Sequence, residues 1–247
     1  MNDLSKYHFA VIGVGNIGRI LLTRLLAVGV AAEHLTVWDI KAERGKVAKE
    51  QFGARLAALI EAEVCAADFI LISTPPKVVL DILRDLSSHL HPGQVILSFA
   101  AAVPLRRLEE VLPDRVGVAR IMPNAPSLLG KGMNPVVFSE KMEPEQRQLV
   151  HLLLEALGET IEVKDEQMNW CVGLTGAAMR SLLPALEGMT QAGIEAGLAE
   201  EEARRVAAQV MLGTAALVLD SGLNLNEIKS LTPMQTTDEG LIAKLYL

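Results

Sequence analysis

The chain has 247 residues, half of them hydrophobic, and a formal net charge of −7. This length and apolar content suffice for one large or two smaller globular domains with a sizeable core. The negative charge argues against nucleic-acid binding, which needs a basic face. The two cysteines, Cys65 and Cys171, have no metal-ligand spacing and form no disulfide framework, so we expect no metal site and a reducing compartment.

The N-terminal segment is polar and leads straight into a predicted strand, which is unlike a signal peptide. No apolar stretch has the length that crossing a bilayer requires. We therefore predict a cytoplasmic protein that does not bind membranes.

The first half of the chain alternates short apolar strands with helices. The chain begins with a predicted strand at 7–12 and a helix at 16–28. A strand at 35–38 and a helix at 41–51 follow, and then a strand at 69–72 and a helix at 78–90. Two more strands are predicted at 95–99 and 116–122. This alternation favours parallel pairing, because each crossover must return over the sheet. We predict an α/β fold with a doubly wound, Rossmann-type parallel sheet.

The second half changes character after a predicted helix at 144–157 and a short strand at 160–163. Two long helices are expected at about 168–196 and 200–221, and both are apolar on more than one side. We predict a Rossmann domain over residues 1–160 and an all-helical dimerisation and substrate domain over 161–247. The helical domain is expected to pair with a second chain in a homodimer or larger homo-oligomer. The alternative is a monomer whose tail folds back on its own sheet.

The most informative motif is Gly-x-Gly-x-x-Gly, formed by Gly13, Gly15 and Gly18 between the first strand and its helix. In a dinucleotide site the first glycine permits a tight turn, the second lets the pyrophosphate approach the backbone, and the third lets helix and strand pack closely. The helix that begins with Asn16 and Ile17 would present free N–H groups to the phosphates. These five residues predict a nicotinamide dinucleotide site, and a glycine turn without a ligand is the alternative.

Asp39 ends the second strand, 21 residues after Gly18, close to the spacing of dinucleotide sites. A carboxylate there accepts hydrogen bonds from the ribose hydroxyls and repels a 2′-phosphate, which slightly favours NAD over NADP. Lys41 and Arg44 follow closely, however, and would hold a 2′-phosphate if Asp39 turned away.

Ligands of open α/β sheets bind at the carboxyl ends of the strands. Ser73, Thr74, Pro75 and Pro76 follow the third predicted strand and are expected to line the adenosine or pyrophosphate path. A rigid turn without ligand contacts is the alternative for each of them.

Two later strand ends are expected to face the nicotinamide end of the crevice. One is 98–101, which includes Ala100, and the other is 120–126, which begins with Arg120. Asn124 offers a donor and an acceptor in a loop stiffened by two prolines, so we predict that it contacts cofactor and substrate. Turn capping is the alternative for Asn124.

These residues resemble the pyrroline-5-carboxylate reductase family. The resemblance rests on the glycine motif, on the Met-Pro-Asn-x-Pro sequence at 122–126 and on Leu-Glu-Gly-Met-Thr-Gln-Ala-Gly-Ile-Glu-Ala-Gly-Leu at 186–198. It spans nearly the whole chain. It implies an oxidoreductase of CH–NH donors in proline biosynthesis, which reduces a cyclic imine with NADPH or NADH. It also implies a Rossmann domain followed by a helical dimerisation domain.

The chain departs from the family in its substrate region. The family's Ser-Pro-Gly-Gly-Thr-Thr loop is here Thr-Pro-Met-Gln-Thr-Thr, residues 232–237. The resemblance implies that this loop's amides hold the substrate carboxylate and that its threonines, here Thr236 and Thr237, serve catalysis at the ring nitrogen. Met234 and Gln235 replace two glycines and restrict the backbone, so carboxylate binding by this loop and proline as product stay open.

The family's Ser-Gly-Ser-Gly-Pro-Ala-Tyr sequence is here Thr-Gly-Ala-Ala-Met-Arg-Ser, residues 175–181, so Gly176 remains and Arg180 is new. A guanidinium can bind a carboxylate through two hydrogen bonds, and we predict substrate-binding roles for Gly176, Arg180 and Glu187. Solvent-exposed surface positions are the alternative for Arg180 and Glu187. Two further functions stay open: reduction of a different imine or keto acid, and dinucleotide sensing without catalysis.

Overall fold

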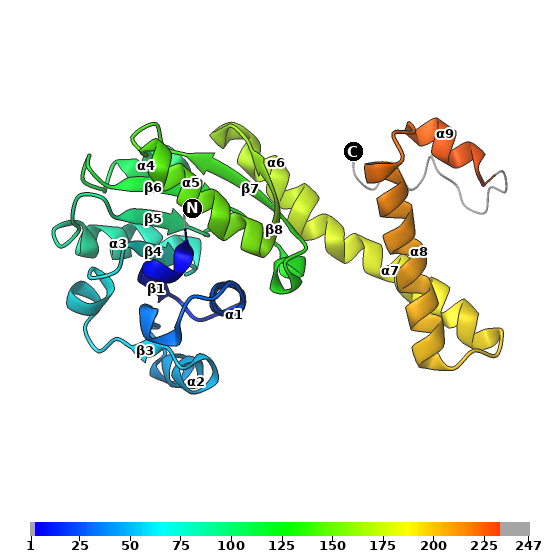
Figure 1. Ribbon diagram of the computed structural model, residues 1–247, viewed down its shortest axis with the longest axis horizontal. Helices are drawn as coiled ribbons and strands as arrows, with labels where there is room; N and C mark the ends of the chain where they lie inside the picture. Colours follow the sequence, from blue (N-terminus) through cyan, green and yellow to red (C-terminus); the bar gives the residue numbers. More distant parts are fainter. Residues whose placement is uncertain (1–2, 233–247) are drawn as a thin grey trace. The chain divides into compact units, whose positions relative to one another are not determined.

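The computed structural model describes residues 3–232 (Figure 1). By its contacts the chain divides into two compact units, Met1–Gly176 and Ala177–Leu247. This division lies after the predicted domain boundary at residue 160. The reason is that the segment that follows the last strand bonds to the first unit, as described below.

The first unit contains an eight-stranded sheet with the order β3-β2-β1-β4-β5-β6-β7-β8. The strands are β1 (Phe9–Ile12), β2 (Leu35–Trp38), β3 (Arg55–Leu56), β4 (Phe69–Ile72), β5 (Val95–Ser98), β6 (Gly117–Ile121), β7 (Gly132–Phe138) and β8 (Gly158–Glu162). All neighbours pair in parallel except β6 and β7. The chain winds outward in both directions from β1 and β4, which makes their junction the switch point where ligands bind in such sheets.

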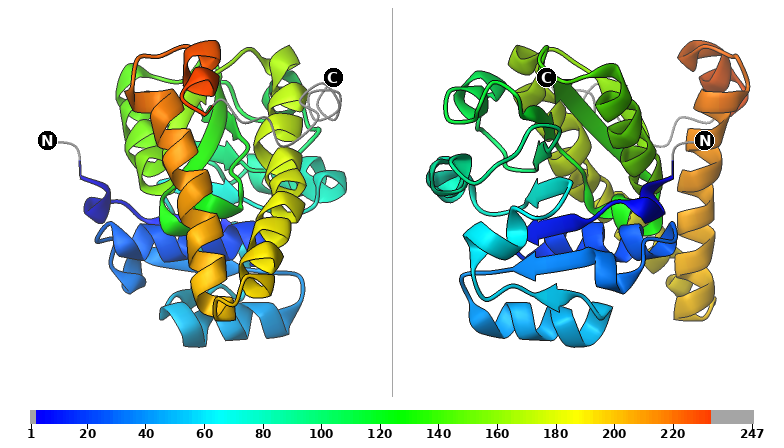
Figure 2. Two further views of the ribbon diagram at one scale, coloured as in Figure 1. Left: turned by 90° about the vertical axis from the view of Figure 1, so that its right-hand side faces the viewer. Right: turned by 60° about the vertical axis from the view of Figure 1, so that its left-hand side comes forward.

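Helices cover both faces of this sheet (Figure 2). The α-helices of the first unit are α1 (Asn16–Ala27), α2 (Ala42–Phe52), α3 (Pro76–Ser87), α4 (Leu105–Glu109), α5 (Pro144–Leu157) and α6 (Met168–Cys171). Short 3-10 helices span Leu4–Lys6, Ala32–His34, Ala125–Leu129 and Asp165–Gln167, and π-helical turns span Ile60–Val64 and Val172–Ala177. Side chains of α1, α2 and α5 build one core, and those of α3, α4 and α6 build the other.

The alternation of side chains along a strand explains the two cores. On β1, Phe9 and Val11 enter one core, whereas Ala10 and Ile12 enter the other. A strand buried on both faces is continuously apolar, as the sequence of β1 is. The predicted Rossmann-type sheet is confirmed.

One strand corrects the expectation of an all-parallel sheet. β7 runs antiparallel to β6 and parallel to β8, and no strand was predicted there. Gly132, Asn134 and Pro135 interrupt its apolar pattern, and proline is rare inside sheets. Pro135 lies just beyond the pairing with β6, which covers Val136–Phe138. Tertiary pairing on both sides therefore decides this strand.

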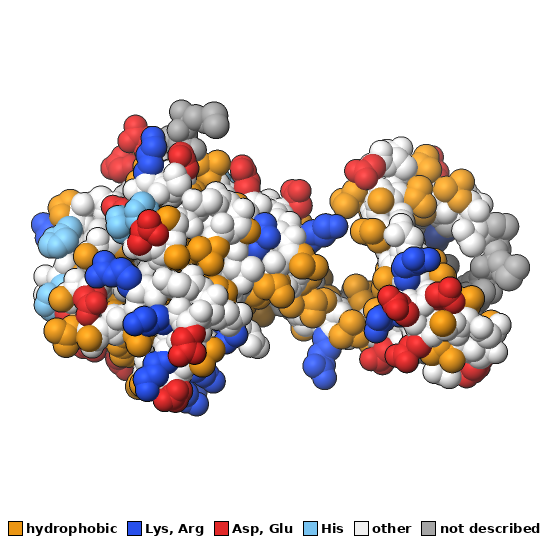
Figure 3. Space-filling model, turned by 60° about the horizontal axis from the view of Figure 1, so that its bottom comes forward, with side chains coloured by type: hydrophobic (Ala, Val, Ile, Leu, Met, Phe, Trp, Pro, Cys, Tyr) orange, Lys and Arg blue, Asp and Glu red, His pale blue; other side chains and the backbone are white. Residues whose placement is uncertain are grey.

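The second unit is helical, as predicted, with α7 (Ala178–Glu195), α8 (Glu200–Asp220) and α9 (Leu225–Ser230). α7 and α8 form a hairpin whose turn contains Gly197 at φ 97°. A Cβ on Gly193 would lie 2.9 Å from the Cβ of Ala203, so the helices approach closely there. Of the residues described in this unit, Ala203 and Ala207 alone are buried. Hydrophobic side chains are spread over its surface in the space-filling view (Figure 3).

Candidate functional site

The turn after β1 has a conformation that requires glycine. Gly13 adopts φ 90°, and its N–H donates to the carbonyl of Trp38 at 2.8 Å. The hydroxyl of Ser73 donates to the carbonyl of Gly13 at 2.5 Å. A Cβ on Gly13 would lie 2.9 Å from Cγ2 of Thr74. The turn is thus held between the ends of β2 and β4.

The other two glycines of the motif differ in what surrounds them. A Cβ on Gly18 would overlap the carbonyl oxygen of Gly13, so this glycine lets α1 sit against the turn. A Cβ on Gly15 would meet no atom within 4 Å and would point into open space. Gly15 is also the N-cap of α1, where no side chain caps the helix and no acidic residue occupies the first turn. The free N–H groups and the helix dipole at this end suit an anion such as a pyrophosphate.

A cavity of about 640 Å³ opens beside these glycines. Predicted cofactor residues that line it are Gly13, Gly15, Ile17, Asp39, Ser73, Thr74, Pro75 and Ala100. Among the other predicted cofactor residues, Gly18 packs under the turn and Asn16 is exposed at the start of α1. The structure therefore brings together residues from the ends of β1, β2, β4 and β5, as the switch-point rule predicts.

Several lining residues were not singled out from the sequence. They are Trp38, Ile40, Val78 and Ile82, whereas the lining residues Pro76, Phe99 and Ala101 belong to strand ends that the sequence already pointed to. Val78 and Ile82 are four residues apart on α3 and therefore share a face of that helix. In the sequence these apolar side chains look like core residues. Only the position of α3 beside the cavity shows that they line it.

Thr74 carries a buried polar atom that suits a bound ligand. Its Oγ1 is buried and has no hydrogen-bond partner among the atoms of residues 3–232, although Thr74 lines the cavity. Buried polar groups are nearly always paired. The open space at Gly15 and this hydroxyl therefore fit a dinucleotide, which offers phosphate and ribose oxygens.

Asp39 braces the glycine turn. One carboxylate oxygen accepts from the N–H of Val14 at 2.7 Å, and the other accepts from the N–H of Lys41 at 2.8 Å. Lys41 and Arg44 line the same part of the cavity, and neither forms an ion pair with another described residue. This end of the cavity thus combines a carboxylate engaged by the backbone with two unpaired cations.

The two strand ends expected at the nicotinamide end behave differently. Phe99, Ala100 and Ala101 line the cavity, whereas Arg120 is buried and pairs with Asp165. The expectation that Arg120 faces the crevice is wrong, because its guanidinium is buried and pairs with the carboxylate of Asp165.

Asn124 is engaged by the protein backbone. Its Nδ2 donates to the carbonyl of Thr175 at 2.9 Å, and its Oδ1 accepts from the N–H of Met133 at 3.2 Å. Asn124 therefore ties the loop after β6 to the π-helical turn that contains Thr175 and Gly176. It does not line the cavity.

The remaining substrate candidates lie on other parts of the chain. Arg180 and Glu187 are both exposed on α7, and neither forms an ion pair within the described part of the chain. Gly176 is exposed, and a Cβ on it would meet no atom within 4 Å. Thr236 and Thr237 lie outside the described residues.

Other site classes find no support in residues 3–232. No three His, Cys, Asp or Glu side chains there lie close enough together to hold a metal ion. None of the helices described there combines the length and apolar character of a membrane span. Burial raises the pKa of the Cys65 thiol to about 11, so this thiol stays neutral near neutral pH.

Comparisons with known proteins agree with this geometry. Residues 8–102 match the family model described as NADP oxidoreductase, coenzyme F420-dependent, and residues 165–244 match that of pyrroline-5-carboxylate reductase dimerisation. The chain is 31% identical to the pyrroline-5-carboxylate reductase of Pseudomonas aeruginosa over 242 residues, 96% of this chain and 88% of that protein. The Escherichia coli enzyme of that name is 28% identical over 233 residues, 93% of this chain and 87% of that protein.

A solved structure shows the same fold. The Plasmodium falciparum pyrroline carboxylate reductase with NADP bound superposes with a TM-score of 0.82 at 17% identity, covering 97% of this chain and 89% of that one. The sheet and the glycine-lined cavity define a dinucleotide-binding protein of the Rossmann class. The likeness to the Pseudomonas aeruginosa protein over almost the whole chain adds the family: this chain belongs to the pyrroline-5-carboxylate reductases.

Proposed function

We propose that this protein is an NAD(P)H-dependent reductase of a cyclic imine, with pyrroline-5-carboxylate as the first substrate to test and proline as its product. The observation that carries the proposal is the cavity beside Gly15, where open space meets the uncapped end of α1. The family membership supplies the reaction class.

A bound reduced nicotinamide would supply the hydride, so the side chains mainly bind and orient. The N–H groups at the start of α1 would hold the pyrophosphate against Gly15. The Thr74 hydroxyl, which has no hydrogen-bond partner among residues 3–232, would bond a ribose or phosphate oxygen. Phe99, Ala100 and Ala101 form an apolar wall that would exclude water beside the ring.

The nucleotide preference depends on Asp39, Lys41 and Arg44. Each Asp39 oxygen already accepts one backbone N–H, and the spare lone pairs would accept ribose hydroxyls, which favours NAD. Lys41 and Arg44 supply the positive charge that a 2′-phosphate needs. We propose that both nucleotides bind.

In Lys41→Ala/Arg44→Ala, affinity for NADPH should fall about 10-fold or more, and that for NADH by less than about 3-fold, because only NADPH carries the phosphate. Equal losses for both nucleotides would contradict these roles.

Substrate binding is proposed from the resemblance and from the exposed charge of Arg180. We propose that Arg180 binds the substrate carboxylate in place of the family's glycine loop, with Glu187 and Gly176 nearby on the same helical run. Thr236 and Thr237 would hydrogen-bond the ring nitrogen and assist its protonation. Asn124 would act on this region through its bond to the Thr175 carbonyl.

The experiment is a turnover assay on the purified protein. NADH or NADPH is mixed with pyrroline-5-carboxylate, and loss of nicotinamide absorbance is followed. We expect turnover, and we expect Arg180→Gln to raise KM for the imine with little change in the nucleotide dissociation constant.

Two other results would redirect the proposal. Turnover of a different imine or of a keto acid, without turnover of pyrroline-5-carboxylate, would identify an altered substrate. Dinucleotide binding without turnover across such a panel would support the sensor alternative.

A further inference from the structure

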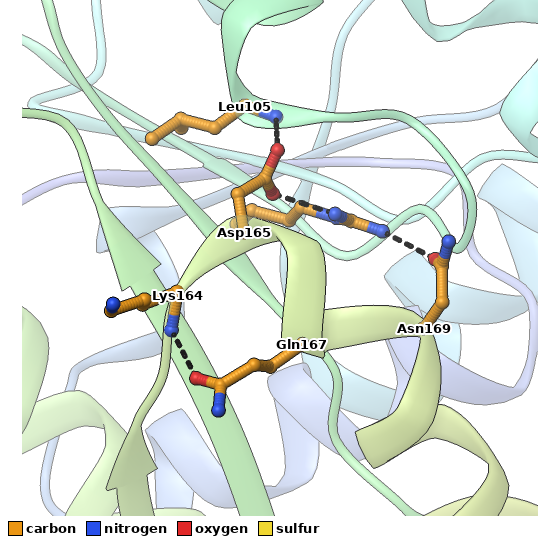
Figure 4. Close-up of polar contacts among 6 residues, drawn as sticks. Leu105, Lys164, Asp165, Gln167 and Asn169 are labelled. Atoms are coloured by element: carbon orange, nitrogen blue, oxygen red, sulfur yellow. Dashed lines mark hydrogen bonds and ion pairs between the residues drawn. The ribbon is translucent and has the colours of Figure 1, made fainter.

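Arg120 on β6 is a buried cation away from the cofactor cavity. Its side chain is 2% exposed, and its Nη1 lies 2.6 Å from Oδ1 of Asp165. Its Nη2 donates to Oδ1 of Asn169 at 3.2 Å. Asp165 and Asn169, both labelled in Figure 4, come from the segment that follows β8, and each accepts a hydrogen bond from a different Nη of Arg120. One strand end thus holds the beginning of the chain that leads to the helical unit.

Asp165 extends this contact to the wall of the cavity. Its second oxygen, Oδ2, accepts from the N–H of Leu105 at 2.9 Å (Figure 4). Leu105 begins α4, and the loop before it starts with Phe99, Ala100 and Ala101, which line the cavity. One carboxylate therefore connects β6, the cavity loop and the segment after β8.

A second contact lies four residues further along the chain from Arg120. Asn124 holds the carbonyl of Thr175 inside the π-helical turn Val172–Ala177. Such turns inside helices are frequent at functional sites. Arg120 on β6 therefore holds one end of residues 165–175, and Asn124 in the loop after β6 holds the other end.

Stability alone is a weak explanation for this buried charge. Taking an ion pair out of water costs about as much as its attraction returns, so apolar pairs often serve equally well. The Nε of Arg120 and the hydroxyl of Ser98, its register partner on β5, are both buried without a hydrogen-bond partner in the described structure. Burying these two unpaired polar atoms costs further free energy of desolvation, and a purely structural role would provide no compensating gain.

We infer that Arg120 is a positioning residue for the proposed reaction. Through Asp165 and Asn169 it sets the cavity loop and the turn at Thr175 and Gly176 in one fixed relation. The nicotinamide end of the site then keeps the geometry that hydride transfer needs. This inference rests on the proposed function.

A double variant of the full chain distinguishes a positioning role of Arg120 from a purely stabilising one. Arg120→Met alone leaves the Asp165 carboxylate without its cation and should lower both the melting temperature and kcat. Arg120→Met/Asp165→Leu replaces the ion pair by an apolar pair and should recover most of the melting temperature, the remaining loss being that of the acceptor for the Leu105 N–H. Its kcat for the imine should stay about 100-fold below wild type, since small displacements of reacting groups cost about that much. The dissociation constant for NADPH should change less than about 3-fold, because Arg120 is not among the residues that line the cavity.

Recovery of kcat together with the melting temperature would overturn the inference. If the double variant does not fold, Asn169→Ala is the deciding variant. It keeps the ion pair but removes one hydrogen bond to Nη2 of Arg120, so kcat should fall about 10-fold while the melting temperature falls only slightly. An unchanged kcat there would count against Arg120. The exposed ion pair between Lys141 and Asp114 is the matched control, and Lys141→Met/Asp114→Leu should keep wild-type kcat.

Absence of turnover in the wild type would be a failure of the proposed function, and the inference would still be tested. The emission of bound NADPH reports on the surroundings of the nicotinamide without any reaction. This emission should differ between wild type and Arg120→Met/Asp165→Leu. If that double variant does not fold, the emission should differ between wild type and Asn169→Ala. Identical emission would overturn the inference.

Discussion

The two units of this chain differ in how much of their apolar surface they bury themselves. In the first unit every residue of β1, β4, β5 and β6 is buried, and helices supply a core on each face. In the second unit α8 has 21 residues and buries only Ala203 and Ala207, while Val206, Val210 and Leu212 are each more than half exposed. Helices with apolar residues on several sides need a partner. The match of residues 165–244 to a dimerisation domain fits that need, so this unit is expected to complete its core with a second chain.

A core substitution gives the largest expected contrast between the units. Leu154 on α5 is fully buried, and Leu154→Ala should lower the free energy of unfolding by about 3 kcal/mol through lost burial and a cavity. Leu212→Ala on α8 removes a half-exposed side chain and should leave the unfolding of the first unit unchanged. Chemical denaturation followed by circular dichroism measures both. Equal losses would mean that the units unfold as one.

The ligand site should fail without loss of the fold. Gly15→Val places a branched side chain in the open space beside α1 and should weaken NADH and NADPH binding by about 100-fold or more. Calorimetric titration measures the binding, and the melting temperature should stay near that of wild type. Gly15→Ala adds only a Cβ, and its nucleotide affinity should lie between those of wild type and Gly15→Val. Undiminished affinity in the valine variant would remove the pyrophosphate from this turn.

A charge on the exposed face of α8 should act on assembly alone. Val210→Asp should raise the dimer dissociation constant by about 100-fold, because a carboxylate would be buried without a partner. Light scattering coupled to size exclusion measures the mass across a dilution series. Glu195→Gln, at the end of α7, is the control and should keep the wild-type mass. A Val210→Asp protein that stays dimeric would place the interface elsewhere.

The smallest expected effect concerns the loop beside the cavity. Ala102 adopts φ 62°, a left-handed conformation that costs an alanine about 1 kcal/mol and glycine nothing. Ala102→Gly should therefore raise the melting temperature slightly, although the more flexible unfolded chain offsets part of the gain. Ala31→Gly, at φ −70°, is the control and should lower it. A lower melting temperature in Ala102→Gly would show that the alanine methyl group packs favourably there.

Local sequence determined much of the cofactor site. Gly13, Gly15 and Gly18 are predictable because each has a local backbone reason, and Asp39 follows from its place at the end of a strand. Trp38, Val78 and Ile82 look like core residues in sequence, since nothing local distinguishes a cavity wall from a packed interior. β3 has only two residues, and β7 contains a glycine and a proline, so both depend on neighbouring strands.

By itself, then, the sequence determined the alternation of strands and helices, the glycine turn and the helical second half, because these follow from the period and type of neighbouring residues. Only the tertiary structure decided that Arg120 is buried against Asp165 and that Asn124 holds Thr175, since the partners are 45 and 51 residues apart. It also decided that Asp39 braces the turn through Val14, 25 residues away. Contacts between distant residues depend on how the elements pack, and a local pattern carries no record of that packing.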